Sequence, residues 1–538
     1  MTAFVRLRAQ IPHELGHYEQ HQVGIEGRFI LAIHAIDATI VIAYLVAVVL
    51  FGLWIGRGQK DLSDYLLGGR DLPWWAILGS IVATETSTAT FLSVPGIAFA
   101  DGGDLRFLQL AIGFVCGRVI VAIVLLPLYF RGKIFSAYEV LDQRFGGATK
   151  QVASLMFLMA RNLGDGLRLF LAGIALELVL GIDLPYCIIA IGIATIVYTF
   201  FGGMKAVIWS DCLQFVIYMT GGVIALVLLV DSFPGGLQRF IEFGQASGKF
   251  RMFDFRVAST GEFAFWTEPY TFWAGLLGGA ALSLGTHGTD QMMVQRYLSA
   301  PTQRDASRAL VLSGFVVFLQ FALFLLLGVA LAGFYSFVQP KVFEHNDQVF
   351  ASYIVNYLPV GLIGFTLAAV FAAAMSTLSS SLNSSASAAV NDFLRPWEQR
   401  RGKESSADRL VRISQRLTVL FGLVQICVGI GASYISRSVV NDALAIAGFT
   451  AGILLGVFFL GVFTRRAHQS GVLIGMTAAI GVLTYVKFGT NVAWPWYAII
   501  GTLATGCVGY LASCVLPATP PRDSDATDNR DVSTGDTC

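Results

Sequence analysis

Long apolar segments separated by short polar connections dominate the chain. A bilayer core about 30 Å thick needs roughly 20 apolar residues per helix, and by this measure the pattern predicts about thirteen membrane helices. They are expected near 33–56, 73–100, 107–130, 151–180, 185–201, 206–231, 270–293, 309–336, 359–391, 409–432, 442–463, 470–488 and 495–516. The sequence therefore predicts an all-α polytopic membrane protein.

Composition supports this class and excludes others. Hydrophobic residues make up 55% of the chain and charged residues 13%, whereas soluble domains carry roughly 25% charged residues. The 36 Lys and Arg against 35 Asp and Glu leave a net charge of +1, which excludes nucleic acid as a partner. Six of the seven cysteines sit in apolar runs, so we expect neither disulfides nor a transition-metal site. The lipid bilayer is the expected environment, and no obligate protein partner is indicated.

The basic residues predict how the helices are oriented. Lys and Arg collect in alternate connections, as cytoplasmic loops do. These residues are Arg57, Lys60, Arg70, Arg131, Lys133, Arg144, Lys150, Lys205, Arg296, Arg304, Arg308, Arg395, Arg400, Arg401, Lys403, Arg409, Arg412, Arg416, Arg465 and Arg466. With thirteen helices, this pattern places the N-terminus outside and the C-terminus in the cytoplasm. We expect a multi-pass protein of the plasma (cell inner) membrane, without a cleavable signal peptide.

Two of the predicted helices look interrupted. The segment 79–96 reads GSIVATETSTATFLSVPG and the segment 275–291 reads GLLGGAALSLGTHGTDQ. Irregular backbone at membrane depth is tolerated only beside protein or a water-filled cavity. Two such helices five segments apart indicate two five-helix repeats that meet at a binding site. Taken singly, each break could instead reflect close packing of small residues.

A hydroxyl-rich face on the ninth segment predicts a cation site. Ser376, Ser379 and Ser380 share one helix face after the Ala-rich start of this segment. Hydroxyls, together with carbonyls freed at the first break, suit a hard cation such as sodium. The alternative is that these residues only allow helices to approach closely. Asp211, at the start of the sixth segment, is either a functional acid or a charge that stabilises a helix N-terminus.

Four separated motifs carry a family resemblance. They are YTFFGGMKAVIWSDCLQ (198–214), GTDQMMVQRYL (288–298), AAAMSTLSSSLNSSA (372–386) and DYLLGGRDLPWW (64–75). In this order they resemble the sodium:solute symporter family, relatives of the sodium/glucose cotransporters, over nearly all of residues 35–465. The resemblance implies a leucine-transporter-like core of ten helices in two inverted repeats. It also implies a sodium-coupled symporter of a small solute and not an enzyme.

The resemblance also implies a division of the chain. The expected units are an extracytoplasmic segment 1–32, an extra helix 33–56, a first five-helix repeat 73–231, an external loop 232–269, a second five-helix repeat 270–463, a C-terminal helix pair 470–516 and a disordered tail 517–538. Its main sodium site would use the carbonyls of Ala83, Thr86 and Ala373 and the hydroxyls of Ser376 and Thr377. A second sodium site of some members matches Asp211, Ser376, Ser379 and Ser380 here.

The solute site departs from the sugar-transporting pattern. Where that pattern has Asn and then Glu-Gln, this chain has Glu85 and then Ala89-Thr90, and a Lys of the pattern aligns with Gln320. Most partners of sugar hydroxyls are missing, which disfavours glucose and galactose. Other neutral solutes stay open. The solute-binding candidates are Glu85, Thr90, Gln109, Arg161, Arg168, Ser283, His287 and Gln320.

Charged residues in the fourth segment suggest the chemistry of the solute. Asp165 lies four residues after Arg161 and three before Arg168, so it can reach both on one helix face. If Asp165 neutralises one arginine, the other can bind a carboxylate with two hydrogen bonds. The alternative is a closed Arg-Asp-Arg network that only orders the helix. We therefore predict a solute that carries a carboxylate.

One short motif points to a different class of protein. His13, Glu14 and His17 match the zinc-protease pattern of two histidines on one helix face with a Glu between them. The motif precedes any segment that could enclose a site, so a membrane zinc protease is a remote alternative. A channel is another alternative, although paired broken helices favour alternating access around a central site.

Overall fold

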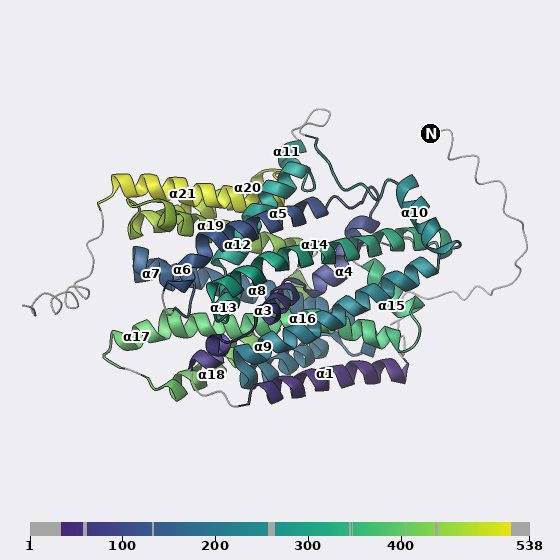
Figure 1. The fold of residues 1–538 in the computed structure, drawn as a ribbon, viewed down its shortest axis with the longest axis horizontal. Helices are drawn as coiled ribbons and strands as arrows, with labels where there is room; N and C mark the ends of the chain where they lie inside the picture. The colour runs from purple at the N-terminus through teal and green to yellow at the C-terminus, as the bar shows by residue number, and fades with distance from the viewer. Residues whose placement is uncertain are drawn as a thin grey trace, which may run out of the picture.

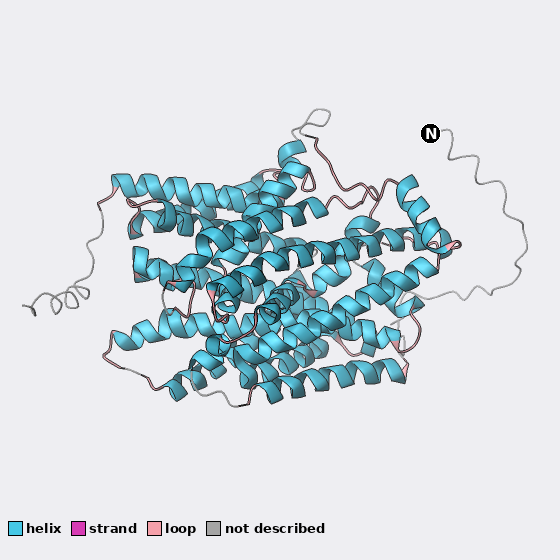
Figure 2. Cartoon of the chain, in the orientation of Figure 1, coloured by secondary structure: helices cyan, strands magenta, loops and turns pink. Residues whose placement is uncertain are grey.

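Helices form every regular element in the described part of the chain. The computed structural model describes residues 34–517 except 58–61, 132–133, 257–263, 344–345, 347, 404 and 436–438. Within these residues there is no strand (Figure 2), as the apolar pattern predicts. Most of the long helices run side by side along the length of the molecule (Figure 1). The zinc-protease motif and most of the C-terminal tail lie outside the described residues.

Nine of the described helical segments are long and apolar enough to cross a membrane. They are Ala35–Ile55 (α1), Leu108–Phe130 (α5, η2 and α6), Leu184–Asp231 (α9), Gln303–Val338 (α14 and η4), Leu362–Gln399 (α16, η5 and α17), Ala407–Ala432 (within α18, Ala407–Ile435), Ile446–Phe463 (within α19, Val439–Phe463), Gln469–Gly489 (α20) and Trp494–Val515 (η6 and α21). The remaining elements outside the two interrupted helices are α2 (Leu62–Leu67), η1 (Gly68–Arg70), α7 (Glu139–Phe145), α8 (Gly147–Leu180), α10 (Gly236–Ala246), α11 (Ala264–Thr267) and α15 (Gln348–Tyr357). A count of thirteen stays a prediction.

The long helix α9 covers two of the predicted segments. The element extends from Leu184 to Asp231 but consists of two helices that meet at non-helical Gly203, where φ is 54° and ψ is −163°. A residue with a side chain rarely adopts this backbone conformation, so glycine is favoured at the bend. This junction lies between the predicted segments 185–201 and 206–231, so each predicted segment corresponds to one of the two helices.

Both predicted interruptions are present. The first separates α3 (Trp74–Glu85) from α4 (Thr88–Phe99), which are bent by 61° around extended residues Thr86 and Ser87. The second follows η3 (Ala274–Gly278) and α12 (Gly279–Thr289) and lies at extended Asp290, before α13 (Gln291–Leu298). The Asp290 side chain accepts the N–H of Met292 at 2.8 Å and so caps α13.

Helix α16 (Leu362–Ala388) lies at the centre of the bundle. Every residue from Thr366 to Ala388 is buried, and the helix packs against α1, α8, α9 and α18. Its start is fixed by Asp37 of α1, whose Oδ1 accepts the N–H groups of Gly361 and Gly364, both at 2.7 Å. Small Ala and Ser side chains allow neighbouring helices to approach α16 closely.

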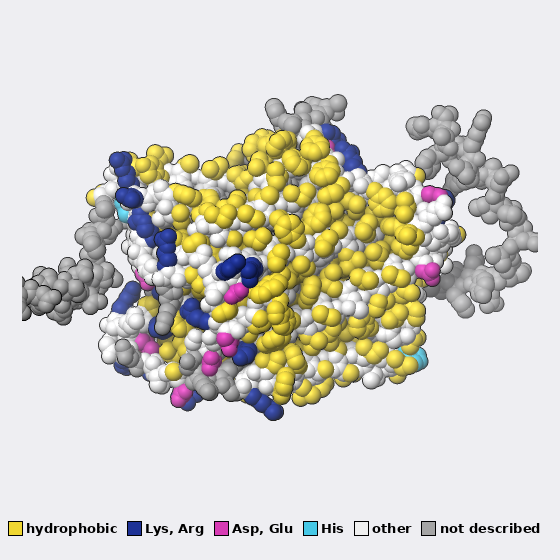
Figure 3. Space-filling model, viewed as in Figure 1, with side chains coloured by type: hydrophobic (Ala, Val, Ile, Leu, Met, Phe, Trp, Pro, Cys, Tyr) yellow, Lys and Arg dark blue, Asp and Glu magenta, His cyan; other side chains and the backbone are white. Residues whose placement is uncertain are grey.

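The helices pack in two groups around this centre. In one group α14 packs against α4 and α5, and α5 packs against α12; in the second group α8, α9, α16 and α18 pack against one another. Helix α3 packs against both α14 and α9. Hydrophobic side chains cover a broad band of the surface, and Lys and Arg gather towards one edge of it, at the left of Figure 3. A membrane protein requires such a band. The inverted-repeat relation between the halves stays a prediction.

The contact between α14 and α4 depends on a glycine. A Cβ at Gly328 would lie 2.0 Å from the carbonyl oxygen of Pro95, so Gly328→Ala forces the two helices apart. We expect a loss of about 1–3 kcal/mol, the usual cost of overpacking. Thermal unfolding in detergent measures this loss. Gly506→Ala in α21 is the control, because its Cβ would meet nothing within 4 Å. Equal melting temperatures for the two variants would contradict this packing.

Candidate functional site

Oxygen atoms gather where the end of α3 meets α16. The Thr377 hydroxyl donates to the carbonyl oxygen of Thr84 at 3.1 Å, so the last turn of α3 is bonded directly to α16. All five residues that the family resemblance assigns to the main sodium site are buried at this junction. They are Ala83, Thr86, Ala373, Ser376 and Thr377. The interruption of α3–α4 leaves carbonyl groups of this turn without helical partners, which makes them available to a cation.

Asp211 of α9 lies beside this junction in a fully buried polar cluster. Its Oδ1 accepts the hydroxyl of Ser376 at 2.7 Å, and its Oδ2 accepts that of Ser80 at 2.5 Å. Thr84 and Ser380 lie within 3.3 and 3.4 Å of Oδ2. Of the residues assigned to a second sodium site, Ser376 and Ser380 therefore contact Asp211 directly. Ser379 donates to the carbonyl of Ser376 within α16 at 3.1 Å.

Arg296 of α13 also belongs to this cluster, which the sequence did not indicate. Its Nη2 lies 3.1 Å from Asp211 Oδ2 and contacts Ser380, and its Nε donates to Ser80 at 2.8 Å. The side chain is 1% exposed. The prediction that Arg296 is one of the basic residues of a cytoplasmic loop was wrong, because its side chain is buried and pairs with Asp211. The available signal was its place in an eight-residue helix directly after a break.

A second buried network joins the two interrupted helices. Glu85, at the end of α3, pairs with Arg118 of α5 and lies 2.7 Å from His287 Nε2 of α12. His287 Nδ1 lies 2.7 Å from the Tyr297 hydroxyl, and Arg118 donates to Ser313 at 3.0 Å. If His287 is neutral and its Nδ1 accepts a hydrogen bond from the Tyr297 hydroxyl, its Nε2–H donates a hydrogen bond to Glu85. The predicted proximity of Glu85 and His287 is present, and each has a partner within the protein.

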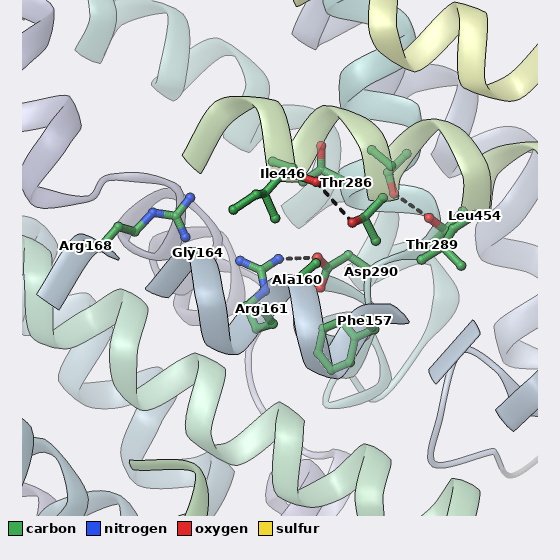
Figure 4. A pocket seen from close by; sticks show the side chains of 14 residues that line it. Phe157, Ala160, Arg161, Gly164, Arg168, Thr286, Thr289, Asp290, Ile446 and Leu454 are labelled. Carbon is green, nitrogen blue, oxygen red and sulfur yellow. Dashed lines mark hydrogen bonds and ion pairs between the residues drawn. The ribbon is translucent and has the colours of Figure 1, made fainter. Parts of the chain in front are cut away.

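A pocket opens between α8, α19 and the second interruption (Figure 4). Arg161 points to Asp290 and pairs with it, while Arg168 pairs with Asp165. Arg161 Nη1 also lies 3.9 Å from Asp165 Oδ2, so Asp165 reaches both arginines, as their spacing predicts. Thr286, Thr289 and Thr450 add hydroxyl groups to the lining. The pocket therefore combines two guanidinium groups, each with a carboxylate partner, and neutral polar groups.

The remaining solute candidates have partners elsewhere in the fold. The Thr90 hydroxyl accepts the N–H of Ser87 at 3.4 Å, and that of Ser283 donates to the Phe114 carbonyl at 3.0 Å. Gln320 accepts the Tyr218 hydroxyl at 3.2 Å. None of the three lines the pocket. Their assignment to the solute stays a prediction.

Gln109 supports the external loop. Its Nε2 donates to the carbonyl of Tyr270 at 3.0 Å, and its Oε1 accepts the N–H of Asp254 at 3.0 Å. Hydrogen bonds from Arg256 hold the pKa of the Asp254 carboxyl well below its usual range, so this group stays charged. The amide of Gln109 is therefore engaged in holding the loop on α5, away from the pocket lining.

The described residues form helices without strands, and two helix breaks lie beside buried polar clusters, which is the architecture of a secondary transporter. The profile of the Sodium:solute symporter family matches residues 65–479, and the chain belongs to this family. Its members are sodium-coupled transporters of small solutes, not enzymes. No group of three or more His, Cys, Asp or Glu in the described residues could hold a metal ion.

Known proteins support the assignment along most of the chain. The sodium/sialic acid symporter NanT of Aliivibrio fischeri is 29% identical over 479 residues, which cover 88% of this chain and 91% of that protein. The human sodium/iodide cotransporter is 29% identical over 489 residues, or 87% and 73% of the two chains. A sodium-coupled sialic acid symporter in a substrate-bound outward-open state has a similar structure, with a TM-score of 0.80 and 26% identity. That likeness covers 90% of this chain and 99% of the other.

The Glu85–Arg118 pair should contribute to stability as a unit. Arg118→Met removes the main charge partner of Glu85, and breaking such a buried pair costs about 3 kcal/mol. The double variant with Glu85→Gln should lose clearly less, because no uncompensated charge remains. Thermal unfolding of the wild type, both single variants and the double variant measures the coupling. Additive losses would show that the two residues act independently.

Proposed function

We propose that the protein imports a small organic carboxylate together with sodium by alternating access. The observation that carries this proposal is the pocket beside the second interruption, where two arginines meet threonine hydroxyls. Arginine binds carboxylates through two parallel hydrogen bonds. Two relatives are named for anions, sialic acid and iodide, of which the first carries a carboxylate. This agrees with an anionic solute here.

The charges in the pocket explain how such a solute would be accepted. Asp165 and Asp290 neutralise Arg168 and Arg161 while the pocket holds no solute, since unpaired charges are costly at membrane depth. An entering carboxylate competes with these acids for a guanidinium and adds one negative charge. A sodium ion that binds at the same time restores neutrality. Charge balance thus favours joint binding of the carboxylate and the cation.

For sodium we propose the junction of α3 and α16. The carbonyls of Ala83, Thr86 and Ala373 and the hydroxyls of Ser376 and Thr377 would form the oxygen shell. Support comes from the direct bond between Thr377 and the Thr84 carbonyl, which brings both helices within reach of one ion. Asp211 Oδ1 is connected to this shell because it accepts a hydrogen bond from the hydroxyl of Ser376. Of the residues matching a second sodium site, Asp211 and Ser380 already contact the Arg296 guanidinium.

Sodium at this junction would order the interruption of α3–α4 and complete the solute site. Such coupling is reciprocal, so sodium raises the affinity for the solute and the solute raises the affinity for sodium. For orientation we propose that the edge rich in Lys and Arg in Figure 3 faces the cytoplasm, with the N-terminus outside and the protein in the plasma membrane. Entry from outside and release inside then follow the sodium gradient.

Removing the two hydroxyls of the proposed sodium shell should weaken sodium binding. In Ser376→Ala with Thr377→Ala, we expect half-maximal uptake to need about tenfold more sodium, a change of roughly 1.4 kcal/mol. Uptake into proteoliposomes at a series of sodium concentrations measures this. Ser384→Ala, about two turns further along α16, is the control. An unchanged sodium requirement in the double variant would contradict the site.

The solute is tested by competition. We expect sodium-dependent uptake from a panel of labelled candidates that includes sialic acid, a short monocarboxylate and iodide. Small carboxylates should inhibit this uptake, and Arg161→Gln or Arg168→Gln should raise the inhibitory concentration at least about tenfold through loss of a charged hydrogen bond. Equal transport of neutral analogues, with inhibition unchanged in both variants, would rule out a carboxylate solute and favour a sugar or another neutral solute.

A further inference from the structure

The Arg296 guanidinium occupies a defined place between helices. Its Nη2 lies 2.5 Å from the Thr84 hydroxyl and 3.1 Å from Asp211 Oδ2, and its Nη1 donates to the Met292 carbonyl at 2.6 Å. With Ser80 and Ser380 these contacts involve α3, α9, α13 and α16. Burying a charged side chain at membrane depth costs free energy, so a residue of this kind is a candidate for a function. The pocket and the solute contacts make no use of it.

Two partners of the guanidinium, Ser80 and Ser380, lie about one helical turn from the proposed sodium shell, on the side that the proposed orientation makes cytoplasmic. A third partner, Thr84, lies level with the shell. On α3, its partner Ser80 precedes Ala83 by three residues, towards the helix start that follows Arg70. On α16, its partner Ser380 follows Ser376 by four residues, towards the end that leads to Arg395. Both displacements point to the edge rich in Lys and Arg. Arg296 therefore stands between the sodium shell and the cytoplasm.

The Asp211 carboxylate separates the two cation positions. Oδ1 accepts the hydroxyl of Ser376, a member of the sodium shell, and Oδ2 faces Arg296. A sodium ion moving inward from the shell would approach a fixed positive charge in a buried, weakly polarisable environment. Coulomb repulsion is strong under these conditions. The Arg296 guanidinium in this position thus opposes inward passage of a cation in two ways: its side chain fills the path from the sodium shell, and its positive charge repels the ion.

Helix α13 holds the guanidinium in place through polar contacts with α16. Gln295 Nε2 donates to Asn383 Oδ1 at 2.7 Å, and Gln291 Nε2 lies 3.5 Å from the Ser387 hydroxyl. With the contact of Arg296 to Ser380, these bonds form an antiparallel ladder along the two helices. All eight residues of α13 are buried. If α13 separates from α16, the guanidinium leaves with it.

We propose that Arg296 is a cationic plug that closes the cytoplasmic exit of the sodium site. Sodium leaves inward only after α13 separates from α16 and withdraws the guanidinium. This assignment rests on the proposed sodium site at the junction of α3 and α16. It makes Arg296 a gating residue that touches neither the solute nor the bound ion, and it predicts that the protein does not leak sodium in the absence of solute.

The test measures sodium flux without solute. Protein in proteoliposomes is given a sodium gradient, and radioactive sodium entry is followed. The wild type should be tight, and Arg296→Gln should raise the flux about tenfold or more, because it removes the charge barrier. Arg296→Lys keeps the charge and should stay near the wild type. Met293→Ala, the matched control on the same helix, loosens buried packing but removes neither a ladder contact nor a charge, and should also stay tight.

Several outcomes would overturn the plug. A folded Arg296→Gln protein with wild-type sodium flux excludes it, and equal leaks in Arg296→Gln and Met293→Ala show that loosened packing, not the cation, is responsible. If the Arg296→Gln protein does not fold or express, the double variant Ser80→Ala with Thr84→Val is used instead, because it removes two hydroxyl partners of the guanidinium. A tight double variant then counts against the proposal. Solute uptake by the wild type is measured in parallel. Uptake that does not depend on sodium would refute the proposed function, whereas the sodium flux of the Arg296 variants tests the plug alone, so the two failures can be distinguished.

Discussion

The pairing of Asp211 with Arg296 is the interaction on which the centre of this protein depends. A lone carboxylate or guanidinium cannot be buried between membrane helices without a severe loss of solvation. Here each charge lies beside the other and is surrounded by hydroxyls of Ser80, Thr84 and Ser380. The pair therefore requires polar residues on α3 and α16 at matching heights. The Ser-rich face of α16, otherwise unusual for a fully buried helix, meets this requirement.

Other buried charges, Glu85 with Arg118 and Arg161 with Asp290, are likewise each paired with an opposite charge. Glu85 and Arg118 join α3 to α5 and, through His287, to α12, so these contacts bind three helices to one another. Arg161 and Asp290 instead join α8 to the second interruption, across the two groups of helices. Contacts of the first kind preserve a rigid unit, while contacts of the second kind must be exchanged if the groups move relative to each other. The pocket proposed for the solute lies at a contact of the second kind.

The sequence predicted features that depend on local pattern. Long apolar helices, a break within each of the segments 79–96 and 275–291 and the proximity of Asp165 to two arginines follow from hydropathy and helix spacing, and the structure contains them. The count of thirteen helices stays a prediction. Features that depend on distant partners were not predicted. Arg296 was counted with the connection charges because its partner Asp211 lies 85 residues away in the sequence. Gln109 looked like a solute ligand because nothing local shows that Asp254 and Tyr270 reach it.

Helix α13 connects the two ends of the proposed mechanism. Its N-terminus is capped by Asp290, which is also the partner of Arg161 in the pocket, and Arg296 lies six residues after that cap. A solute carboxylate that takes Arg161 releases Asp290 from its ion pair, at the point where α13 begins. Because α13 is short and helical throughout, a shift at Asp290 moves the whole segment, including the guanidinium. Solute binding and inward release of sodium would then depend on one helix, so neither occurs efficiently without the other.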